Sequence, residues 1–422
     1  MSASGERAMV VVGAGQAGLQ AAEALRTAGW TGAVLLFGEE PVGPYHRPPL
    51  SKAFLAGRME MAQLAMRAPE ALARRQIELR TGVRVVAIDR VARAIALNDG
   101  SRLPYEGLVL ATGARARSLP IHTTDVRGFF ILRTLADATD LSAALSACAR
   151  EGRPLVVVGG GFIGLEVAAT ARGAGVEVTV LEAAPRLLAR VLTPALSQWF
   201  EALHRHHGVT VLTDVQVAGL DTDESGAVVA VALADGRRLP AGAILAGVGA
   251  VANDELAREA GLECDRGIVV DDCGRTVDPC ITAAGDCTAR RLADGSLLRL
   301  ESVNNATEQG RAAALALLGQ ERPFRSTPWF WSDQYDRKLQ MAGLSAGADE
   351  HVLRGRLEDG SFSVFHLRGG HLVAVDSVNA PREHLLARRL LDAGAKPAAA
   401  QCADTGFDLG TLLPAASSAG GA

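Results

Sequence analysis

The sequence predicts an α/β protein in which two similar βαβ domains are followed by a smaller α+β domain. Two observations lead to this prediction. An apolar run followed by a Gly-x-Gly-x-x-Gly pattern occurs twice, at Val10–Gly18 and at Val156–Gly164. The segments after the two patterns also repeat the same order of expected elements. At 422 residues the chain is long enough for two or three domains.

Each glycine pattern has the composition of a strand, a tight turn and a helix. The apolar runs are typical of buried parallel strands, and Ala/Leu-rich stretches of helical character follow the glycines. In such a loop the glycines permit a tight turn, a close approach of the backbone to a pyrophosphate, and close packing of helix on strand. The phosphates then meet the free N–H groups at the start of the helix.

Each expected helix is followed by a second apolar run that ends at an acidic residue. The first copy runs Ala33–Glu39 and the second Val176–Glu182. An acid at this distance accepts hydrogen bonds from the ribose of a dinucleotide. The sequence therefore predicts two dinucleotide-binding domains, with Glu39 and Glu182 as their ribose acids.

Beyond the acids, both halves continue with the same three features: a strand, a turn that contains Asp-Gly, and an apolar strand that ends in glycine. These are Val83–Ile88, Asn98–Pro104 and Gly107–Gly113 in the first half, and Val209–Val217, Ala234–Pro240 and Ile244–Gly249 in the second. The repeated layout predicts that the two halves share one fold.

The last third of the chain first completes the first domain and then changes in texture. Arg275–Asp286 indicates a strand that leads into a Gly-Asp turn, and Glu308–Leu318 a helix. From Pro328, aromatic residues cluster, and alternating strands and a helix follow at Phe362–Leu367, His371–Val375 and Pro381–Asp392. The predicted domains are residues 1–116 with 246–322, residues 117–245, and residues 323–422.

Charge and apolar patterning exclude several classes of protein. The net charge of −4 gives no global attraction to nucleic acid or to an anionic membrane. No apolar stretch is long enough to span a membrane, and Met1–Arg7 lacks the apolar core of a signal peptide. We therefore expect a cytoplasmic protein without nucleic-acid or membrane partners.

Cysteine and histidine usage predicts no metal site. The six cysteines contain no Cys-x-x-Cys pair, which argues against a dithiol redox centre and a thiolate zinc site. The run His204–His207 has only Glu201 as a carboxylate nearby in sequence, and it lies near an expected helix end. We expect this run to form a solvated face.

Five short segments carry a more specific signal: Pro44–Lys52, Ala111–Gly113, Leu132–Thr134, Ala284–Cys287 and Trp329–Gln334. In these segments, and from Val10 to about Leu413, the chain resembles the FAD-dependent NADH:ferredoxin reductases of bacterial oxygenase systems (the putidaredoxin-reductase-like class). The resemblance implies a glutathione-reductase-like architecture, in which two Rossmann-like domains are nested and a C-terminal α+β domain follows. It also implies FAD in the first domain and NADH in the second.

The resemblance, together with the glycine loops, assigns residues to the two cofactors and to catalysis. For FAD these are Gly13, Gly15, Gln16, Ala17, Gly18, Glu39, Arg47, Lys52, Val85, Ala111, Thr112, Gly113, Arg133, Asp286 and Val303. For NAD they are Gly159, Gly161, Phe162, Ile163, Gly164, Glu182, Arg190 and Gly247. The implied catalytic residues are Lys52, Glu166 and Trp331, with Lys52 under the flavin N5/O4 edge and paired with Glu166.

The expected reaction takes a hydride from NADH and passes single electrons to an acidic two-iron ferredoxin, which feeds a haem monooxygenase or a Rieske-type oxygenase. We expect NADH over NADPH because Glu182 repels a 2′-phosphate, with Arg186 and Arg190 near enough in sequence to weaken the bias. The ferredoxin is expected to dock near Trp331. The basic residues expected at the docking face are Arg311, Arg337 and Lys338, with Arg290, Arg291 and Arg299 extending it. The protein is expected to be a monomer or a weak dimer.

Two other classes of function remain open. Thiol-dependent relatives need one or two cysteines after the first ribose acid, and residues 40–60 contain none. A reductase of a small organic acceptor, such as monodehydroascorbate or a quinone, shares much of the Tyr45–Lys52 pattern. A non-enzymatic flavoprotein would instead oxidise NADH slowly. The acceptor that gives turnover distinguishes these alternatives.

Overall fold

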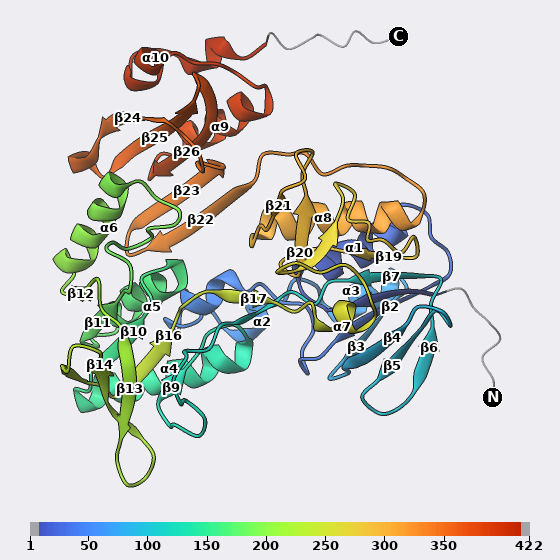
Figure 1. Ribbon diagram of the computed structural model, residues 1–422, viewed down its shortest axis with the longest axis horizontal. Helices are drawn as coiled ribbons and strands as arrows, with labels where there is room; N and C mark the ends of the chain where they lie inside the picture. The colour runs from blue at the N-terminus through green and yellow to red at the C-terminus, as the bar shows by residue number, and fades with distance from the viewer. Residues whose placement is uncertain (1–7, 415–422) are drawn as a thin grey trace. The chain divides into compact units, whose positions relative to one another are not determined.

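The computed structural model, drawn in Figure 1, describes residues 8–414. The chain divides into two compact units. Unit 1 is Met1–Arg117, Arg133–Leu135 and Gly249–Arg325, and unit 2 is Ser118–Leu132, Ala136–Val248 and Ser326–Ala422. The unit boundaries therefore lie near the predicted domain ends at residues 116, 245 and 322. The further division of unit 2 into a nucleotide domain and a C-terminal domain stays a prediction, and residues 1–7 and 415–422 of the predicted domains lie outside the described residues.

The centre of unit 1 is a parallel five-stranded sheet in the order β19-β7-β1-β2-β3. Its strands are β1 Ala8–Val12, β2 Ala33–Gly38, β3 Ile77–Thr81, β7 Gly107–Leu110 and β19 Ile281–Ala283. Successive residues of β1 enter different cores: Val10 packs in one hydrophobic cluster and Val11 in another. Because both faces of the sheet are covered, the inner strands β1, β2 and β7 are apolar throughout, as the sequence predicted, whereas the edge strand β3 contains Glu78 and Arg80.

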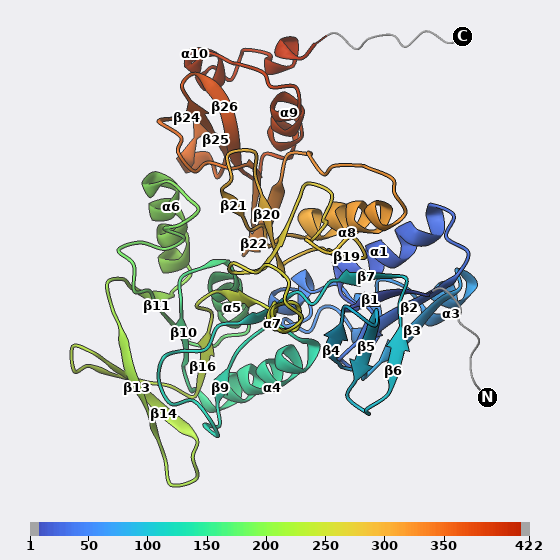
Figure 2. The same ribbon diagram turned by 45° about the vertical axis from the view of Figure 1, so that its right-hand side comes forward.

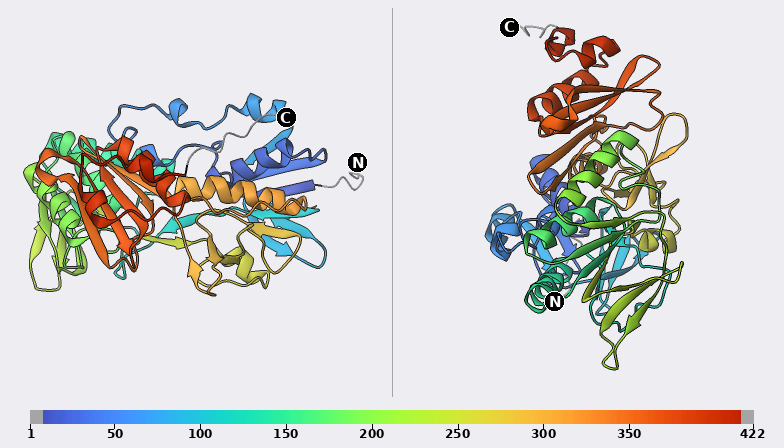
Figure 3. Two further views of the ribbon diagram at one scale, coloured as in Figure 1. Left: turned by 90° about the horizontal axis from the view of Figure 1, so that it is seen from above. Right: turned by 90° about the vertical axis from the view of Figure 1, so that its left-hand side faces the viewer.

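Two helices, α1 Gln16–Thr27 and α8 Val303–Leu317, lie side by side on one face of this sheet (Figure 3, left). The antiparallel meander β4-β5-β6 packs on the other face through Ile95 and Leu97. The other elements of unit 1 are η1 Pro48–Ser51, α2 Met61–Leu64, α3 Pro69–Arg74, β4 Val85–Asp89, β5 Ala94–Leu97, β6 Arg102–Pro104, β8 Ala114–Ala116, β17 Ala250–Ala252, α7 Glu255–Glu259, β18 Ile268–Val270, β20 Thr288–Arg291 and β21 Leu297–Leu298.

The first part of unit 2 repeats this plan with the parallel sheet β12-β11-β10-β16-β9. The meander β13-β14-β15 packs on it through Val228 and Val231. The elements are β9 Phe129–Phe130, α4 Leu135–Glu151, β10 Leu155–Val158, α5 Phe162–Gly173, β11 Val178–Leu181, α6 Pro194–His206, β12 Thr210–Leu212, β13 Val217–Thr222, β14 Val228–Leu233, β15 Arg238–Pro240 and β16 Ala243–Ala246. The duplication expected from the sequence is thus present in the fold.

The second part of unit 2 is an antiparallel sheet in the order β22-β23-β26-β25-β24, with α9 packed along β26 and β23 (Figure 2). Phe365 and Val375 on the sheet share a core with Ala387 and Leu390 of α9. The elements are β22 Trp329–Gln334, β23 Arg337–Gly343, β24 Glu350–Arg356, η2 Leu357–Asp359, β25 Ser361–Arg368, β26 His371–Val378, α9 Pro381–Asp392, α10 Ala399–Ala403 and η3 Leu409–Leu412.

Several predicted elements are confirmed. Both Asp-Gly turns form, with Gly100 and Gly236 at φ of 85° and 90°, a region that glycine adopts readily. The hairpin around Gly369 pairs β25 with β26, and α9 has the predicted bounds. Both strands are longer than expected, and Phe362–Leu367 is buried throughout. The reason is that Phe365 faces α9 while Phe362 contacts Trp199 of α6 at 5.3 Å between ring centroids.

Three predicted elements are wrong in extent. The strand expected at Val209–Val217 is two strands, because Asp214 between them has a left-handed φ of 55°. Helix α8 begins five residues before the expected start, because the Ser302 side chain accepts from Asn305 N and caps it. The strand expected from Arg275 is only Ile281–Ala283, since the side chain of Asp278 bonds the backbone N–H of Cys280 in place of a strand partner.

Within residues 8–414, no helix has the length and apolar character needed to cross a membrane. The same described residues contain no cluster of three or more His, Cys, Asp or Glu side chains that could hold a metal ion.

Candidate functional site

The first glycine loop is built so that two glycines are required by packing and one leaves space. A Cβ on Gly13 would lie 2.1 Å from the Ala111 carbonyl oxygen, and a Cβ on Gly18 would lie 1.8 Å from the Gly13 carbonyl oxygen. No atom lies within 4 Å of the Cβ position of Gly15. Gly13 also has a φ of 109°, which side-chain-bearing residues rarely adopt. Thus Gly13 and Gly18 hold strand, turn and helix together, and Gly15 faces open space.

The second loop has the same construction in unit 2. A Cβ on Gly159 would lie 2.5 Å from the Gly247 carbonyl oxygen, and one on Gly164 would lie 2.2 Å from the Gly159 carbonyl oxygen. Around Gly161 the nearest atom is that same Gly247 oxygen, at 3.9 Å. The predicted NAD residue Gly247 therefore packs directly against the second glycine loop.

The helices that follow the two loops have amide groups available for a phosphate. Gly15 and Gly161 are the N-caps of α1 and α5, where no side chain caps the helix and no acid lies in the first turn. By contrast, Thr193 and Ser302 cap α6 and α8 with their side chains. Uncapped first-turn N–H groups can bind the phosphates of a dinucleotide, so the residues of both loops fit such a ligand.

The two ribose acids lie where the sequence predicted, each directly after the second strand of its sheet, but in different environments. Glu39 has a side chain 69% exposed, with Arg84 at 3.6 Å. Glu182 is fixed: its two carboxylate oxygens accept from Gly160 N at 2.7 Å and from Ala184 N at 2.8 Å. A carboxylate oxygen has room for a second donor, so Glu182 can still accept the ribose hydroxyls.

The two arginines near Glu182 differ in availability. Arg186 donates to the Leu192 and Ala189 carbonyl oxygens and to Ser197 Oγ, all at 2.7–2.8 Å. Arg190 is exposed. Arg186 therefore holds the loop before α6, and any attraction of a 2′-phosphate would fall to Arg190.

The segment Pro44–Lys52, which contains the predicted FAD residues Arg47 and Lys52, is hydrogen-bonded to residues 133–135 of the same unit. Glu40 accepts from Tyr45 Oη and from Arg47, each at 2.7 Å. Arg47 also donates to the Arg133 carbonyl oxygen at 2.6 Å, and Leu135 N donates to Tyr45 Oη at 3.0 Å. Burial raises the pKa of Tyr45 above its usual range, so the phenol stays protonated and donates to Glu40. The sequence indicates Arg47 as an FAD residue, but it does not indicate Glu40, which holds Arg47 in place.

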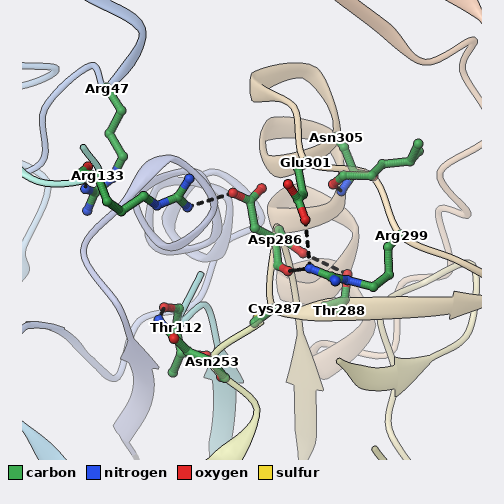
Figure 4. Close-up of polar contacts among 12 residues, drawn as sticks. Arg47, Thr112, Arg133, Asn253, Asp286, Cys287, Thr288, Arg299, Glu301 and Asn305 are labelled. Atoms are coloured by element: carbon green, nitrogen blue, oxygen red, sulfur yellow. Dashed lines mark hydrogen bonds and ion pairs between the residues drawn. The ribbon is translucent and has the colours of Figure 1, made fainter. Parts of the chain in front are cut away.

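Asp286 lies in a polar cluster shown in Figure 4. Its carboxylate pairs with Arg133 at 2.7 Å, and its carbonyl oxygen accepts from Arg299 at 3.3 Å. The turn before it depends on Gly285, whose N–H donates to the buried side chain of Gln309 at 2.9 Å. Two predicted FAD residues, Arg133 and Asp286, are thus brought together, and Gln309 is a supporting residue that the sequence did not indicate.

Thr112 is held by a reciprocal pair of hydrogen bonds with Asn253, also visible in Figure 4. Thr112 Oγ1 donates to the Asn253 carbonyl oxygen at 2.5 Å, and Asn253 Nδ2 donates to the Thr112 carbonyl oxygen at 2.9 Å. The segment Ala111–Gly113 that follows β7 is thereby anchored to the chain that returns from unit 2. Arg133 Nη2 lies 3.8 Å from the Cβ position of Gly113.

The other predicted FAD residues vary in what their side chains do. Gln16 donates to Thr307 Oγ1 at 2.8 Å, and a Cβ on Gly310 would press on the Ala17 carbonyl oxygen at 2.4 Å. The Val85 side chain packs in the core, so a part in binding would fall to its backbone. Val303 is the first residue of α8, and Lys52 Nζ lies 3.3 Å from the Pro48 carbonyl oxygen.

Glu166 and Trp331, the predicted catalytic residues of unit 2, lie on α5 and β22. Glu166 is 2% exposed and accepts from Ser332 Oγ at 2.7 Å. Trp331 is half-buried, with the Trp329 ring at 5.5 Å between centroids. The predicted pairing of Glu166 with Lys52, which belongs to unit 1, stays a prediction. At the start of α5, the predicted NAD residue Phe162 packs on Phe330 at 4.7 Å, and Ile163 is 43% exposed.

The run His204–His207 does not form a uniformly solvated face, so that expectation is wrong for His204. This side chain is 0% exposed and contacts Gln334 Oε1 at 2.8 Å. The helical spacing explains the error, because α6 turns His204 towards β22 while Arg205 and His206 face outward. An apolar i, i+4 pattern that includes Phe200 could have indicated this.

The basic residues expected at a docking face mostly have acidic neighbours. Arg290 is 18% exposed and lies over the Phe324 ring, and Arg299 is 22% exposed and points at Asp286, so these two do not extend a surface patch. The other four basic side chains are more exposed, and each has an acidic partner. The pairs are Arg311 with Glu308 at 3.1 Å, Arg337 with Asp336 at 3.3 Å, Lys338 with Asp333 at 3.6 Å, and Arg291 with Glu263 at 2.5 Å.

Comparison with known proteins gives a consistent result. Residues 7–310 match the family described as pyridine nucleotide-disulphide oxidoreductase, and residues 329–413 match the family described as reductase C-terminal. The chain is 46% identical over 390 residues to putidaredoxin reductase of Pseudomonas putida, covering 91% of each chain. It is 41% identical over 385 residues to the ferredoxin–NAD(+) reductase subunit of the benzene 1,2-dioxygenase system of the same species, covering 91% of this chain and 92% of the other. The solved structure of the covalent putidaredoxin reductase–putidaredoxin complex matches with a TM-score of 0.92 and 42% identity, covering 97% of this chain and 98% of the other.

Proposed function

The chain belongs to the pyridine nucleotide-disulphide oxidoreductase family, within its putidaredoxin-reductase-like ferredoxin reductases, and from this premise we propose that it is an FAD-dependent NADH:ferredoxin reductase of an oxygenase system. The observation that carries the proposal is the pair of uncapped helices, α1 and α5, each of which begins at a glycine whose Cβ position has no atom closer than 3.9 Å. Two such sites in two parallel sheets fit two dinucleotides.

When bound, FAD accepts a hydride from NADH and supplies single electrons to a one-electron acceptor. The chain's own residues hold it. The first-turn amides of α1 receive the pyrophosphate, and Glu39 accepts the adenosine ribose hydroxyls. Asp286, held by Arg133, would bind the ribitol or the pyrophosphate, and Arg47, held by Glu40, would contribute a positive charge to the same cofactor.

NADH is held along α5 in the same way, and Glu182 decides which nicotinamide cofactor binds. Its fixed carboxylate accepts the two hydroxyls of the adenosine ribose and repels a phosphate at the 2′ position. Lys52 and Glu166 are proposed at the flavin edge, where a cation stabilises negative charge that arrives on the ring. Residues 40–60 contain no cysteine, so the disulphide chemistry in the family's name has no counterpart here.

The acceptor is proposed to be an acidic two-iron ferredoxin that docks near Trp331. A locally basic face on a protein of net charge −4 favours brief, steered encounters. Because Arg311, Arg337 and Lys338 each have an acidic neighbour, their attraction is partly offset, and we expect weak, salt-sensitive docking. A monomer or weak dimer and a cytoplasmic location are likewise proposed.

The proposal is tested by NADH-dependent reduction of a panel of two-iron ferredoxins, each coupled to cytochrome c. Turnover with ferredoxin should rise well above the ferredoxin-free rate and saturate with its concentration. Ferricyanide serves as the control acceptor, because it reports hydride uptake without docking. Full ferricyanide turnover without turnover of any ferredoxin, together with reduction of monodehydroascorbate or a quinone, would refute the proposed acceptor.

A further inference from the structure

A buried row of five polar side chains in unit 2 ends at Glu166. Ser332 Oγ lies 2.7 Å from Glu166 Oε1, and Gln334 Nε2 lies 3.1 Å from Ser332 Oγ. His204 Nε2 lies 2.8 Å from Gln334 Oε1, and Tyr335 Oη lies 3.1 Å from His204 Nδ1. The four side chains from Glu166 to His204 are at most 2% exposed, so their bonds are shielded from water.

The chemistry of the groups sets the direction of every bond in this row. Gln334 gives its amide N–H to Ser332, so its oxygen faces His204 and must accept. His204 therefore carries its hydrogen on Nε2, and its bare Nδ1 accepts from the Tyr335 hydroxyl. Ser332 already accepts from Gln334, which leaves its own hydrogen for Glu166. All the donors point towards the carboxylate.

The neutral state of His204 agrees with this direction. Burial lowers the pKa of His204 to about 4, so near neutral pH the ring has one hydrogen and one bare nitrogen. Burial also raises the pKa of Tyr335 above its usual range, which keeps the phenol protonated as the first donor.

The outer end of the row is held in place by packing. Tyr335 has a left-handed φ of 56°, which is uncommon for a bulky residue, at the turn between β22 and β23. Its ring stacks on His207 with centroids 3.7 Å apart and planes within 12°. The conformation of Tyr335 is therefore stabilised by the contacts that also aim its hydroxyl at His204.

The row is unsuited to carrying protons. Gln334 lies in the middle, and an amide passes a proton along only by converting to its imidic acid form. What such a row can do is hold its terminal acceptor in one orientation, because a charge-assisted bond from Ser332 restrains the carboxylate. Two elements distant in sequence, α6 and β22, thus act together on one residue of the nucleotide-binding helix α5.

We propose that Ser332 and Gln334, backed by His204 and Tyr335, are positioning residues that orient the Glu166 carboxylate in the hydride-transfer site. The C-terminal sheet then has a part in hydride transfer as well as in contacts with the acceptor. This inference rests on the proposed function, in which Glu166 borders the flavin.

The test uses the FAD-loaded protein with Ser332→Ala, and Ser363→Ala as a matched control. Ser363 is likewise buried in the same sheet and shares a 2.8 Å hydrogen bond with Ser377, but it has no bond to Glu166. Single-turnover reduction by NADH should slow about tenfold in Ser332→Ala, which is about 1.4 kcal/mol at the transition state. The NADH concentration for half-maximal rate should change less than twofold, and Ser332→Thr should restore the rate.

Two further measurements separate a positioning role from a structural one. The midpoint potential of the bound FAD, measured at equilibrium without turnover, should move in Ser332→Ala and stay at the wild-type value in Ser363→Ala. In a Glu166→Gln background, Ser332→Ala should slow reduction less than twofold, because the bond it removes no longer acts on a charge.

Equal slowing in Ser332→Ala and Ser363→Ala would overturn the inference, as would an undiminished effect of Ser332→Ala in the Glu166→Gln background. An unchanged rate and potential in Ser332→Ala would overturn it too. Failure of the proposed function looks different, because the wild-type protein itself would then either not be reduced by NADH or be reduced by NADH and turn over no ferredoxin. Thermal unfolding of each variant identifies one that has not folded. If Ser332→Ala does not fold, Gln334→Met, which removes the N–H that Ser332 accepts, is compared with wild type in its place and should slow reduction.

Discussion

Replacement of Glu182 by glutamine should reduce the preference for NADH over NADPH. The carboxylate is held by Gly160 N at 2.7 Å and by Ala184 N at 2.8 Å, so it cannot swing away from an incoming 2′-phosphate. Glutamine has nearly the same shape and removes the charge. It keeps one acceptor oxygen, for one of the two amides and for the ribose, and turns its NH2 group towards the other amide. The lost hydrogen bond affects the binding of both cofactors, so the ratio of the two kcat/KM values reports the electrostatic part of the selectivity.

The size of the effect follows from Coulomb's law. Two unit charges ~4 Å apart repel by ~4 kcal/mol at an effective dielectric constant of ~20, and counterions reduce this by about half. The remaining ~2 kcal/mol corresponds to roughly 30-fold in kcat/KM. Arg190 is exposed and able to approach the phosphate, which lowers the expected ratio to somewhat above tenfold. In Glu182→Gln the ratio should fall to within about threefold of unity.

The assay is ferricyanide reduction with each nicotinamide cofactor, with Glu177→Gln as the control. Glu177 is exposed and precedes β11, whereas Glu182 follows it, so both variants lose one negative charge. Five residues of extended strand at ~3.3 Å each separate the two positions by ~16 Å, beyond the screening length of ~8 Å in physiological salt. Equal kcat/KM for the two cofactors in the wild-type protein would refute the reasoning. So would an unchanged ratio in Glu182→Gln, or the same change in Glu177→Gln.

Three other outcomes are expected. FAD should be bound without a covalent link, so acid precipitation should release all the yellow colour, whereas Gly13→Ala should purify without FAD because its Cβ would lie 2.1 Å from the Ala111 oxygen. Stability should fall as pH falls from about 6.5 to about 4, because burial lowers the pKa of His204 and His384 to about 4 and the unfolded chain then binds more protons. At ~1.4 kcal/mol per pKa unit each histidine accounts for about 3 kcal/mol, and urea midpoints that are flat over this range would contradict it. Raised salt and Arg311→Glu should each increase the KM for ferredoxin and leave ferricyanide turnover unchanged. Arg237→Glu, at a similarly exposed and ion-paired site, should leave both the KM for ferredoxin and ferricyanide turnover unchanged.

The glycine loops and the acids that follow them were predictable because their causes are local. Gly13 and Gly159 have φ near 110°, and the strand, turn and helix that meet there are consecutive in the chain. A pattern of nine residues therefore contains most of the geometry that it specifies. The duplicated βαβ layout follows from the same short-range rules of apolar period and turn chemistry.

Element ends were less predictable, because single side chains decided them. The Ser302 hydroxyl moves the start of α8, and Asp214 divides an expected strand in two by adopting a left-handed φ. In both cases the competing local conformations differ in free energy by about 1 kcal/mol. A pattern of apolar residues does not distinguish conformations that are so close in free energy.

The contacts that complete the site depend on the tertiary structure. Ser332 lies 166 residues from Glu166 in the chain, and Gln334 lies 130 residues from His204. Nothing in either segment specifies the other, since each hydrogen bond exists only after β22 has packed against α5 and against His204 of α6. The sequence by itself determined two nucleotide-binding loops with their ribose acids, because neighbouring residues supply both the turn and the donors. Only the folded chain decided that a histidine in an apparently solvated run is buried, and that a distant sheet supplies the donor to Glu166.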